Sequence, residues 1–391
     1  MTRIHEHFNL ESLTASQREL LDALEAFFQS DEQVFLLFGA AGTGKTFMTK
    51  GIANWLKQRQ KEERLPDPPE STNMMAFTGR AALILRQKTG FDTSTIHSFV
   101  YRKTAQVEKS EKEVKHSESL VLEFGIEDSS SLTLDHCSIV DEASMFPAAK
   151  HEQEHIKFGT GRLLEDWVKR TEIGRKTNSR KAIFVGDPAQ LPPVGEPNSP
   201  AQDAQYLEQN FGLKCTEFTL KEVVRQAQDS NIIRQANHVR ACIEKRDWNL
   251  RIEPGRDVVK ELPEASLKAL WHLERGTPPP NDRIVITHSN EEARNFNHEV
   301  RSACFDELDL LHPGETLLVT SNVYSTAASF MNGELVRVVA VADGLVQRTI
   351  TLKNKVGNVV NEQKVDLAFK KVKLLKDGEL HAQEQFIFWP Y

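Results

Sequence analysis

The sequence is poor in cysteine, and it has neither a long apolar run nor an excess of positive charge. Its four cysteines are scattered without a C-x-x-C pair, which argues against a zinc site and against a disulfide framework. No stretch approaches the ~20 apolar residues of a membrane span, and the opening MTRIHEHFNLESL lacks the apolar core of a signal peptide. We therefore expect a cytoplasmic protein with reduced thiols and no membrane partner.

The formal net charge of −7 excludes a protein that is coated in positive charge. A broadly basic surface is the usual mark of a nucleic-acid-binding protein. An enzyme that holds one strand in a narrow groove, however, needs only locally placed donors and stacking surfaces. The net charge therefore does not exclude a DNA-binding enzyme.

What the sequence does contain is the spacing G-x-x-x-x-G-K-T, in GAAGTGKT, after the apolar run Val34–Phe38. This run predicts a buried strand, and a helical pattern follows it. In this spacing, backbone N–H groups and a helix N-terminus converge on phosphate, Lys45 reaches the β/γ oxygens and Thr46 holds Mg²⁺. A glycine-rich turn without a ligand is the alternative. The predicted nucleotide-binding residues are Gly39, Ala40, Ala41, Gly42, Thr43, Gly44, Lys45 and Thr46.

Two further apolar strands end in polar turns, in SIVDEASM and KAIFVGDPAQLPPVG. The first delivers Asp141, which can hold Mg²⁺, and Glu142, which can orient or deprotonate the attacking water. The second delivers Asp187 and Gln190, and the Gln190 amide can both donate to a γ-phosphate and position water. An apolar run that ends in D-E is also a common helix start. After a phosphate loop, the pattern favours a hydrolase of nucleoside triphosphates.

The remaining patterns predict the organisation of the chain. Residues up to about 215 read as a doubly wound parallel sheet that is preceded by a helix, with Thr14 or Ser16 as its cap. The stretch DRIVITHSN, residues 282–290, predicts a buried strand between two helices. From Pro313 onward, short alternating runs are typical of a small antiparallel barrel.

As an ordered series, these motifs resemble the RecD/Dda group of superfamily 1B DNA helicases, which move 5′ to 3′ on single-stranded DNA. The resemblance extends to about Val339 and rests on LTASQ, GAAGTGKT, AFTGRAA, STIHSF, IVDEASM, GDPAQLPPVG, LKEVVRQ, ITHSN and MNGELVRVV. It implies an α/β fold with two RecA-like domains. The first is residues 1–216, with a hairpin insertion (1B) at about 101–132. The second is residues 217–312, followed at 313–391 by an SH3-like 2B subdomain that runs into a remaining strand of the second domain.

The resemblance also implies roles for individual residues. Gln17 would read adenine, and Arg225 would reach the γ-phosphate; the alternative for Arg225 is a pair with Glu222. Phe124 would be the apolar tip of a wedge hairpin, or instead an anchor of that hairpin to the main domain. The other residues implied to lie along DNA are Thr78, Arg80, Thr95, His97, Asn290 and Asn332, of which Thr95 and His97 could instead be structural turn residues.

The chain departs from the family at its end. The family continues with a segment of the type H-K-x-Q-G and a later arginine, whereas this chain ends at QEQFIFWPY. We interpret the sequence as a fragment cut within the second RecA-like domain. ATP binding should survive such a cut, whereas coupled unwinding would need the missing groups.

The predicted function is a monomeric ATP-dependent DNA helicase with Mg²⁺ as cofactor. Its partners would be single-stranded DNA, single-strand/duplex junctions, and proteins of DNA replication, repair or recombination. One alternative is a DNA-stimulated ATPase subunit of a repair nuclease complex. The other is a nucleotide-switched single-strand-binding module without unwinding activity, against which the complete set of Lys45, Asp141, Glu142 and Gln190 speaks.

Overall fold

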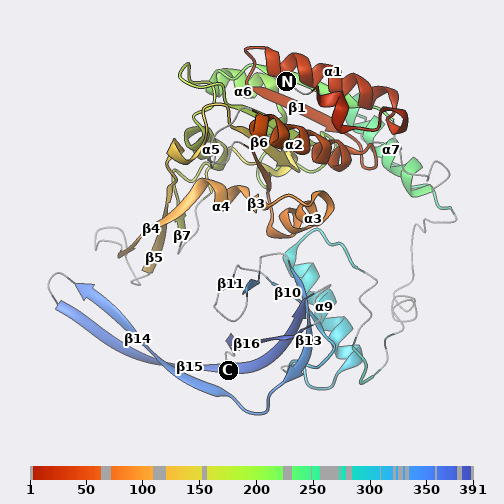
Figure 1. The fold of residues 1–391 in the computed structure, drawn as a ribbon. Helices are drawn as coiled ribbons and strands as arrows, with labels where there is room; N and C mark the ends of the chain where they lie inside the picture. The colour runs from red at the N-terminus through yellow and green to blue at the C-terminus, as the bar shows by residue number, and fades with distance from the viewer. Residues whose placement is uncertain are drawn as a thin grey trace. The chain divides into compact units, whose positions relative to one another are not determined.

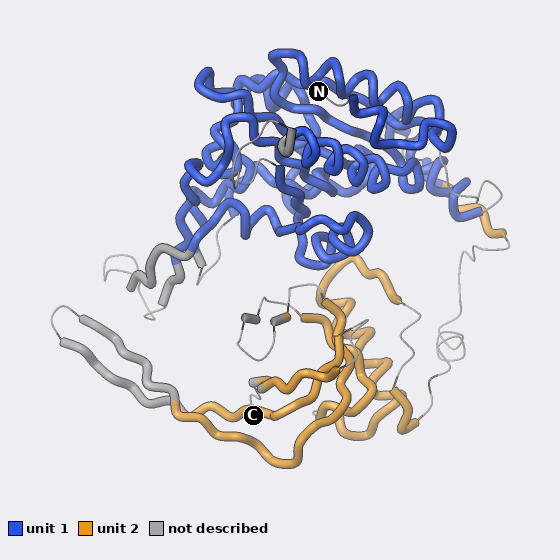
Figure 2. The backbone as a smooth tube through the Cα atoms, in the orientation of Figure 1, with its two compact units in different colours: residues 1–250 blue, residues 251–391 orange. Residues whose placement is uncertain are grey.

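A computed structural model describes most of the chain as two compact units, Met1–Leu250 and Arg251–Tyr391 (Figure 2). Residues 217–250, which the sequence pattern assigns to the second domain, belong to the first unit. The described residues are 3–62, 72–108, 120–151, 156–222, 231–247, 249–255, 273, 275–278, 284–308, 310–319, 323–324, 329–330, 334–356, 359–376 and 381–388.

A six-stranded sheet forms the centre of unit 1 (Figure 1). All its neighbouring strands run parallel, in the order β3-β2-β6-β8-β1-β9, which confirms the predicted parallel α/β sheet. The strands are β1 (Val34–Gly39), β2 (Thr72–Ala76), β3 (Thr93–Thr95), β6 (Cys137–Asp141), β8 (Lys181–Gly186) and β9 (Cys215–Leu220).

Helices cover both faces of this sheet. They are α1 (Ala15–Gln29), α2 (Lys45–Glu62), α3 (Gly79–Thr89), α4 (Ile96–Val100), α5 (Leu163–Thr171), α6 (Ala204–Phe211) and α7 (Asn231–Lys245). Short 3₁₀ turns lie at η1 (Ile4–His7), η2 (Leu10–Ser12), η3 (Ser129–Ser131), η4 (Ala143–Met145) and η5 (Pro200–Gln202).

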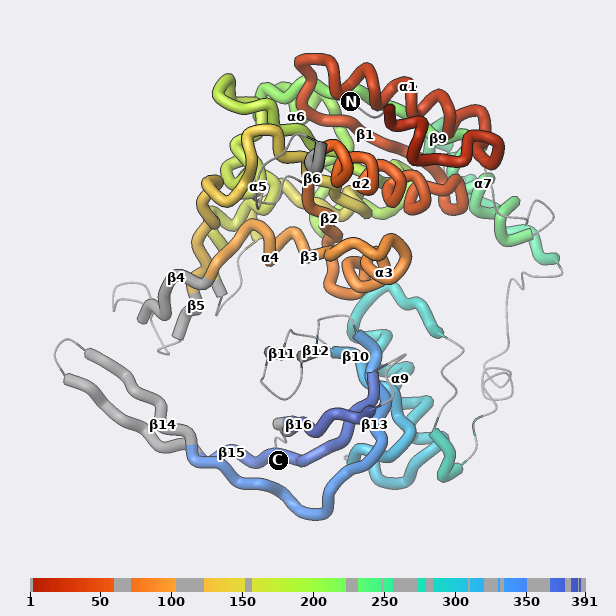
Figure 3. Tube along the Cα trace, viewed as in Figure 1, coloured from red at the N-terminus to blue at the C-terminus, as the bar shows by residue number. Residues whose placement is uncertain are grey.

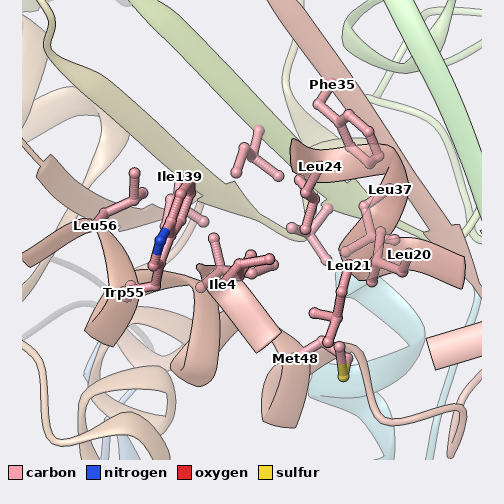
Figure 4. Close-up of a cluster of buried hydrophobic side chains, with 14 of the residues drawn as sticks. Ile4, Leu20, Leu21, Leu24, Phe35, Leu37, Met48, Trp55, Leu56 and Ile139 are labelled. Atoms are coloured by element: carbon pink, nitrogen blue, oxygen red, sulfur yellow. The ribbon is translucent and has the colours of Figure 1, made fainter. Parts of the chain in front are cut away.

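The alternation of β1 side chains decides which helices pack on which face. Phe35 and Leu37 point to the side of α1, α2 and α3, in a cluster of which Figure 4 shows part. Leu36 and Phe38 point to the other side and share a second cluster with α4, α5 and α6. There Trp167 is fully buried, with its ring 5.2 Å from that of Phe184. Burying a side chain of this size stabilises the fold by about 2–3 kcal/mol. The two clusters therefore stabilise the sheet on both of its faces.

A three-stranded sheet follows α4, where the sequence predicts an insertion. β4 (Tyr101–Glu108) pairs antiparallel with β5 (Leu120–Ile126), and β7 (Ile156–Phe158) pairs parallel with β5. The predicted hairpin is therefore confirmed.

The expected position of Phe124 at the tip of this hairpin is wrong. Phe124 lies opposite Lys103, two residues from the pair Tyr101–Ile126 that begins the ladder. Its half-buried ring stacks on Phe158 with the ring centroids 5.0 Å apart, next to the second core cluster. The structure thus supports the alternative, in which Phe124 anchors the hairpin to the main domain.

Unit 2 contains one described helix, α9 (Asn290–Cys304), and two antiparallel sheets, whose strands can be followed along the chain in Figure 3. The strands of unit 2 pair antiparallel, as predicted. Among the described residues, however, the larger sheet runs from β10 to β14 without a pairing that closes it into a barrel. The strands are β10 (Thr316–Leu318), β11 (Val323–Tyr324), β12 (Ser329–Phe330), β13 (Leu335–Val341), β14 (Val346–Val356), β15 (Val359–Lys376) and β16 (Gln383–Phe388).

The buried strand expected at 282–290 is not found in its described part. Residues 284–287 belong to no strand, and Ile284 and Ile286 are 81% and 88% exposed. Apolar alternation supplies only a propensity, because a strand also needs a partner for its backbone groups.

Two expectations that concern the whole chain can be compared with the described residues. All four cysteines are free, and Cys137, Cys242 and Cys304 are buried. Burial raises the pKa of the Cys137 thiol to about 12, so this group is an inert part of the core. No helix in the described ranges is long and apolar enough to cross a membrane.

Candidate nucleotide site

The G-x-x-x-x-G-K-T stretch forms a tight turn between β1 and α2, as its spacing predicts. Gly42 and Gly44 have φ angles of +88° and +90°, which favour glycine. A Cβ on Gly44 would also lie 2.6 Å from the Gln17 side chain. Thr43 is buried, and its hydroxyl donates to the Ala40 carbonyl at 2.9 Å. The turn is therefore closed tightly by its own backbone and leads directly into the N-terminus of α2, which begins at Lys45.

Lys45 lies folded over this turn. Its ammonium donates to the carbonyls of Gly39, at 2.6 Å, and Ala40, at 3.1 Å. Burial lowers the pKa of Lys45 below its ordinary value, while the carboxylates of Asp187, Glu142 and Asp141 oppose that shift. A half-buried cation held by two neutral carbonyls near three carboxylates is well placed to exchange those carbonyls for phosphate oxygens.

Gln17 joins the start of α1 to the phosphate loop. Thr14 is the N-cap of α1 and forms a capping box with Gln17, so of the two predicted caps Thr14 is the one used. The Gln17 side chain accepts from the Thr14 N–H at 3.1 Å and donates to the Thr43 carbonyl at 3.0 Å. The Gln17 side chain is buried, and both its amide oxygen and its amide nitrogen already have hydrogen-bond partners. Recognition of adenine by Gln17 stays a prediction.

Asp141 and Glu142 lie at the carboxyl end of β6. Glu142 has left-handed backbone angles, φ 53° and ψ 43°, and its N–H donates to the Asp141 carboxylate at 3.1 Å. Burial and the neighbouring charge of Glu142 raise the pKa of Asp141 to about 6. Two crowded carboxylates on a strained turn are unusual for a purely structural loop.

Gln190 is tied to the same turn. It follows β8, the neighbour of β6 in the sheet, and its side-chain oxygen accepts from the Ser144 hydroxyl at 3.0 Å. Ser144 is fully buried in η4, two residues after Glu142. The turns after β6 and β8 are therefore one connected structure.

Asp187 and Arg240 form an ion pair that the sequence patterns did not predict. Arg240 of α7 donates to both oxygens of Asp187, at 2.6 Å and 2.9 Å. Burial alone would raise the pKa of Asp187, but the hydrogen bonds from Arg240 and from the Ala189 N–H outweigh it and the pKa is lowered. The polar turn after β8 indicates Asp187, whereas no signal in the sequence identifies Arg240.

Arg225 lies outside the described residues, so its expected reach to the γ-phosphate is an open prediction. Its alternative partner, Glu222, accepts hydrogen bonds from the Thr14 hydroxyl, at 3.1 Å, and from the Ser16 hydroxyl and N–H at the start of α1.

The described residues expected along DNA belong to several different elements of the chain. Thr78 follows β2, which is next to β6 in the sheet, and Thr95 ends the edge strand β3. Each is an N-cap, Thr78 for α3 and Thr95 for α4. The His97 ring lies among Phe77, Tyr101 and Phe158, and burial, followed by the charge of His151, lowers its pKa. Thr95 and His97 therefore have structural roles, as the alternative interpretation of these two residues proposed. These roles do not test whether either residue contacts DNA.

Of the remaining candidates, Arg80 is exposed in the first turn of α3. Asn290 is exposed at the start of α9, in unit 2. Asn332 lies outside the described residues.

The residues at the site fit a nucleotide with Mg²⁺. Thr46 in the first turn of α2 and Asp141 at the end of β6 would supply oxygen ligands, and a cation would offset the burial and the neighbouring charge of Glu142 that raise the pKa of Asp141. In the described ranges, no three or more His, Cys, Asp or Glu side chains are grouped so that they could hold a metal.

We expect Asp141→Asn to raise the free energy of unfolding at about pH 8 by roughly 1–3 kcal/mol. A carboxyl pKa raised to about 6 from 3.8 means that the folded state disfavours the ionised group. The parent protein therefore loses stability as the pH rises from about 4 through about 6, and the variant does not. Denaturation by urea at about pH 8 and about pH 4 measures the gain, which should vanish at the lower pH. The exposed Asp135→Asn is the control, and an equal gain at both values would contradict the expectation.

One comparison with known proteins matches the part of the chain that contains the turn between β1 and α2. Residues 23–196 match the sequence model of a family described as an AAA domain. No curated protein matches the chain. The matched residues lie within unit 1 and include the turn between β1 and α2, in a mixed α/β arrangement with a parallel sheet.

Solved structures with similarity to the chain include Pif1 helicases. One concerns DNA unwinding at forked duplex DNA by two coordinating Pif1 helicases, with a TM-score of 0.42, 17% identity, and coverage of 96% of this chain and 81% of that chain. Another is Pif1 from Bacteroides with ADP-AlF3 and single-stranded DNA, with a TM-score of 0.40, 16% identity and coverage of 96% and 82%. A third is Pif1 helicase from Candida albicans, with a TM-score of 0.40, 16% identity, and coverage of 96% of this chain and 78% of that chain. At these values the similarity does not establish a shared overall fold or activity.

Proposed function

We propose that the chain is an ATP-dependent superfamily 1 DNA helicase or translocase that moves 5′ to 3′ on single-stranded DNA. One observation carries the proposal: the phosphate loop after β1, Asp141 and Glu142 at the end of β6, and Gln190 after β8 meet at one edge of the parallel sheet. Ligands of open parallel sheets bind at this edge. The polarity rests on the order of the motifs.

The roles of the side chains follow from their chemistry. Lys45 would exchange its two carbonyl partners for the β- and γ-phosphate oxygens of ATP. Glu142 would accept the proton of the attacking water, and Gln190 would orient that water. Thr46 and Asp141 would hold Mg²⁺, which when bound neutralises charge on the phosphates.

The proposed DNA-binding surface lies at the strand ends beside the nucleotide site. The segments at the ends of β2 and β3 carry exposed or half-exposed polar groups, of Thr78, Arg80 and Thr95; β2 adjoins β6, and β3 lies on the other side of β2. A nucleotide-driven shift of the turn after β6 would therefore have a short route to bound DNA.

The proposal is tested by measuring ATP hydrolysis with and without single-stranded DNA, and by the displacement of streptavidin from biotinylated oligonucleotides. We expect DNA to stimulate hydrolysis and streptavidin to leave the 3′ end faster than the 5′ end. Lys45→Ala is the negative control. Hydrolysis that DNA does not stimulate would refute a translocase, and DNA affinity that responds to ATP without hydrolysis would favour the nucleotide-switched binding module. Stimulation without directional displacement would favour an ATPase subunit that serves a partner.

A further inference from the structure

We infer that Arg240 is a positioning residue for ATP hydrolysis, acting through Asp187 on Gln190. The inference deepens the proposed function and rests on it. Arg240 belongs to α7, the last described helix of unit 1, whereas Gln190 belongs to the turn after β8. The two residues are far apart in the sequence, and Asp187 connects them.

The first link is the ion pair itself. The two terminal guanidinium nitrogens of Arg240, Nη1 and Nη2, each donate to one oxygen of the buried Asp187. This bidentate geometry fixes the position of the carboxylate and also neutralises its charge. A lysine in place of Arg240 could supply the charge but not both bonds.

The second link is the turn that Asp187 organises. Its side chain accepts from the Ala189 N–H at 3.0 Å, and its backbone carbonyl accepts from the Gln190 N–H at 3.0 Å. The Gln190 side chain then bonds to Ser144, which lies next to the Glu142 turn. A shift of the Asp187 carboxylate therefore displaces the backbone that aims Gln190.

The third observation concerns what else holds α7. Among its described residues only Asn231 and Cys242 are buried, and Ile232 is 57% exposed. The Arg240–Asp187 pair therefore joins a mostly exposed helix to the turn after β8. The Nε–H of Arg240 is buried and has no hydrogen-bond partner among the described residues. Burying this donor without a partner costs free energy, which the ion pair with Asp187 must offset.

The test compares steady-state ATP hydrolysis by Arg240→Ala and by Arg234→Ala, an exposed arginine on the same helix. We expect Arg240→Ala to lower kcat by about 100-fold while KM for MgATP changes less than about threefold, because the water is misplaced but the phosphate loop is intact. Arg234→Ala should keep the parental kcat. Arg240→Lys should recover part of the loss, and Asp187→Asn, which keeps the shape of the carboxylate, should reproduce it.

A double-mutant cycle with Gln190→Ala separates positioning from a general structural effect. If Arg240 acts through Gln190, then Arg240→Ala lowers kcat no further once Gln190 is absent. Additive losses would overturn the inference. A tenfold or greater rise in KM for Arg240→Ala would also overturn it, since Arg240 would then contact the phosphates itself.

Failure of the proposed function would be visible in the parent protein, and failure of this inference only in the variants. Should the parent bind nucleotide without turning it over, the same cycle is measured on the affinity for ADP–aluminium fluoride, which mimics the transferred phosphoryl group. Coupling between Arg240 and Gln190 in that affinity supports the inference, and its absence refutes it. A parent protein that binds no nucleotide would remove the proposed function and this inference together.

Discussion

Glu142→Gln is expected to bind MgATP as the parent protein does and to lose about 10²–10⁴-fold in kcat. The substitution removes a base but keeps the shape of the side chain and the left-handed backbone at this position. The neighbouring Asp141 and the phosphate loop are unchanged, so the ground-state contacts to nucleotide should survive. Calorimetry measures the affinity, and phosphate release under saturating ATP measures kcat.

The exposed Glu208→Gln on α6 is the matched control, because it removes one carboxylate that is not among the proposed site residues. Its turnover should equal that of the parent protein. Turnover by Glu142→Gln at the parental rate would show that Glu142 is not the group that orients or deprotonates the water.

Lys45→Ala should abolish tight MgATP binding, with a rise in Kd of about 100-fold or more. The Thr43 hydroxyl also donates to the Ala40 carbonyl, but it is neutral and cannot replace the charge of the Lys45 ammonium against the β- and γ-phosphates. Calorimetric titration with MgATP gives the affinity directly. An unchanged Kd would disprove the phosphate-loop assignment.

The control for this variant is Lys50→Ala, an exposed lysine further along α2. Because Lys45 also bonds to two carbonyls of the turn, its removal could loosen the turn itself. Thermal denaturation without nucleotide measures that effect separately, and Lys50→Ala should change neither stability nor affinity.

The phosphate loop and the central sheet could be predicted because both depend on local pattern. Gly42 and Gly44 have the backbone angles that their spacing implies, and the run Val34–Phe38 forms a buried strand. Strand ends that carry Asp141 and Gln190 had to meet once the sheet was parallel.

The misjudged or missed residues depend on register and on tertiary placement. Phe124 was expected at a hairpin tip, but pairing from Tyr101–Ile126 onward puts it near the base. That error could have been avoided by counting residues from both ends of the hairpin. Arg240 could not have been predicted, because which arginine faces Asp187 depends on how α7 lies on the sheet.

The strand order also determines when the phosphate loop can assemble during synthesis. β1 pairs only with β8 and β9 among the described strands, and both emerge from the ribosome long after it. At roughly 5–20 residues per second, β1 waits on the order of ten seconds for its first partner. Through that interval an apolar strand and its glycine turn have no sheet to join, so the segment most conspicuous in the sequence is among the last to acquire its native neighbours. A chaperone that binds the nascent chain would therefore find its most exposed target in Val34–Gly39.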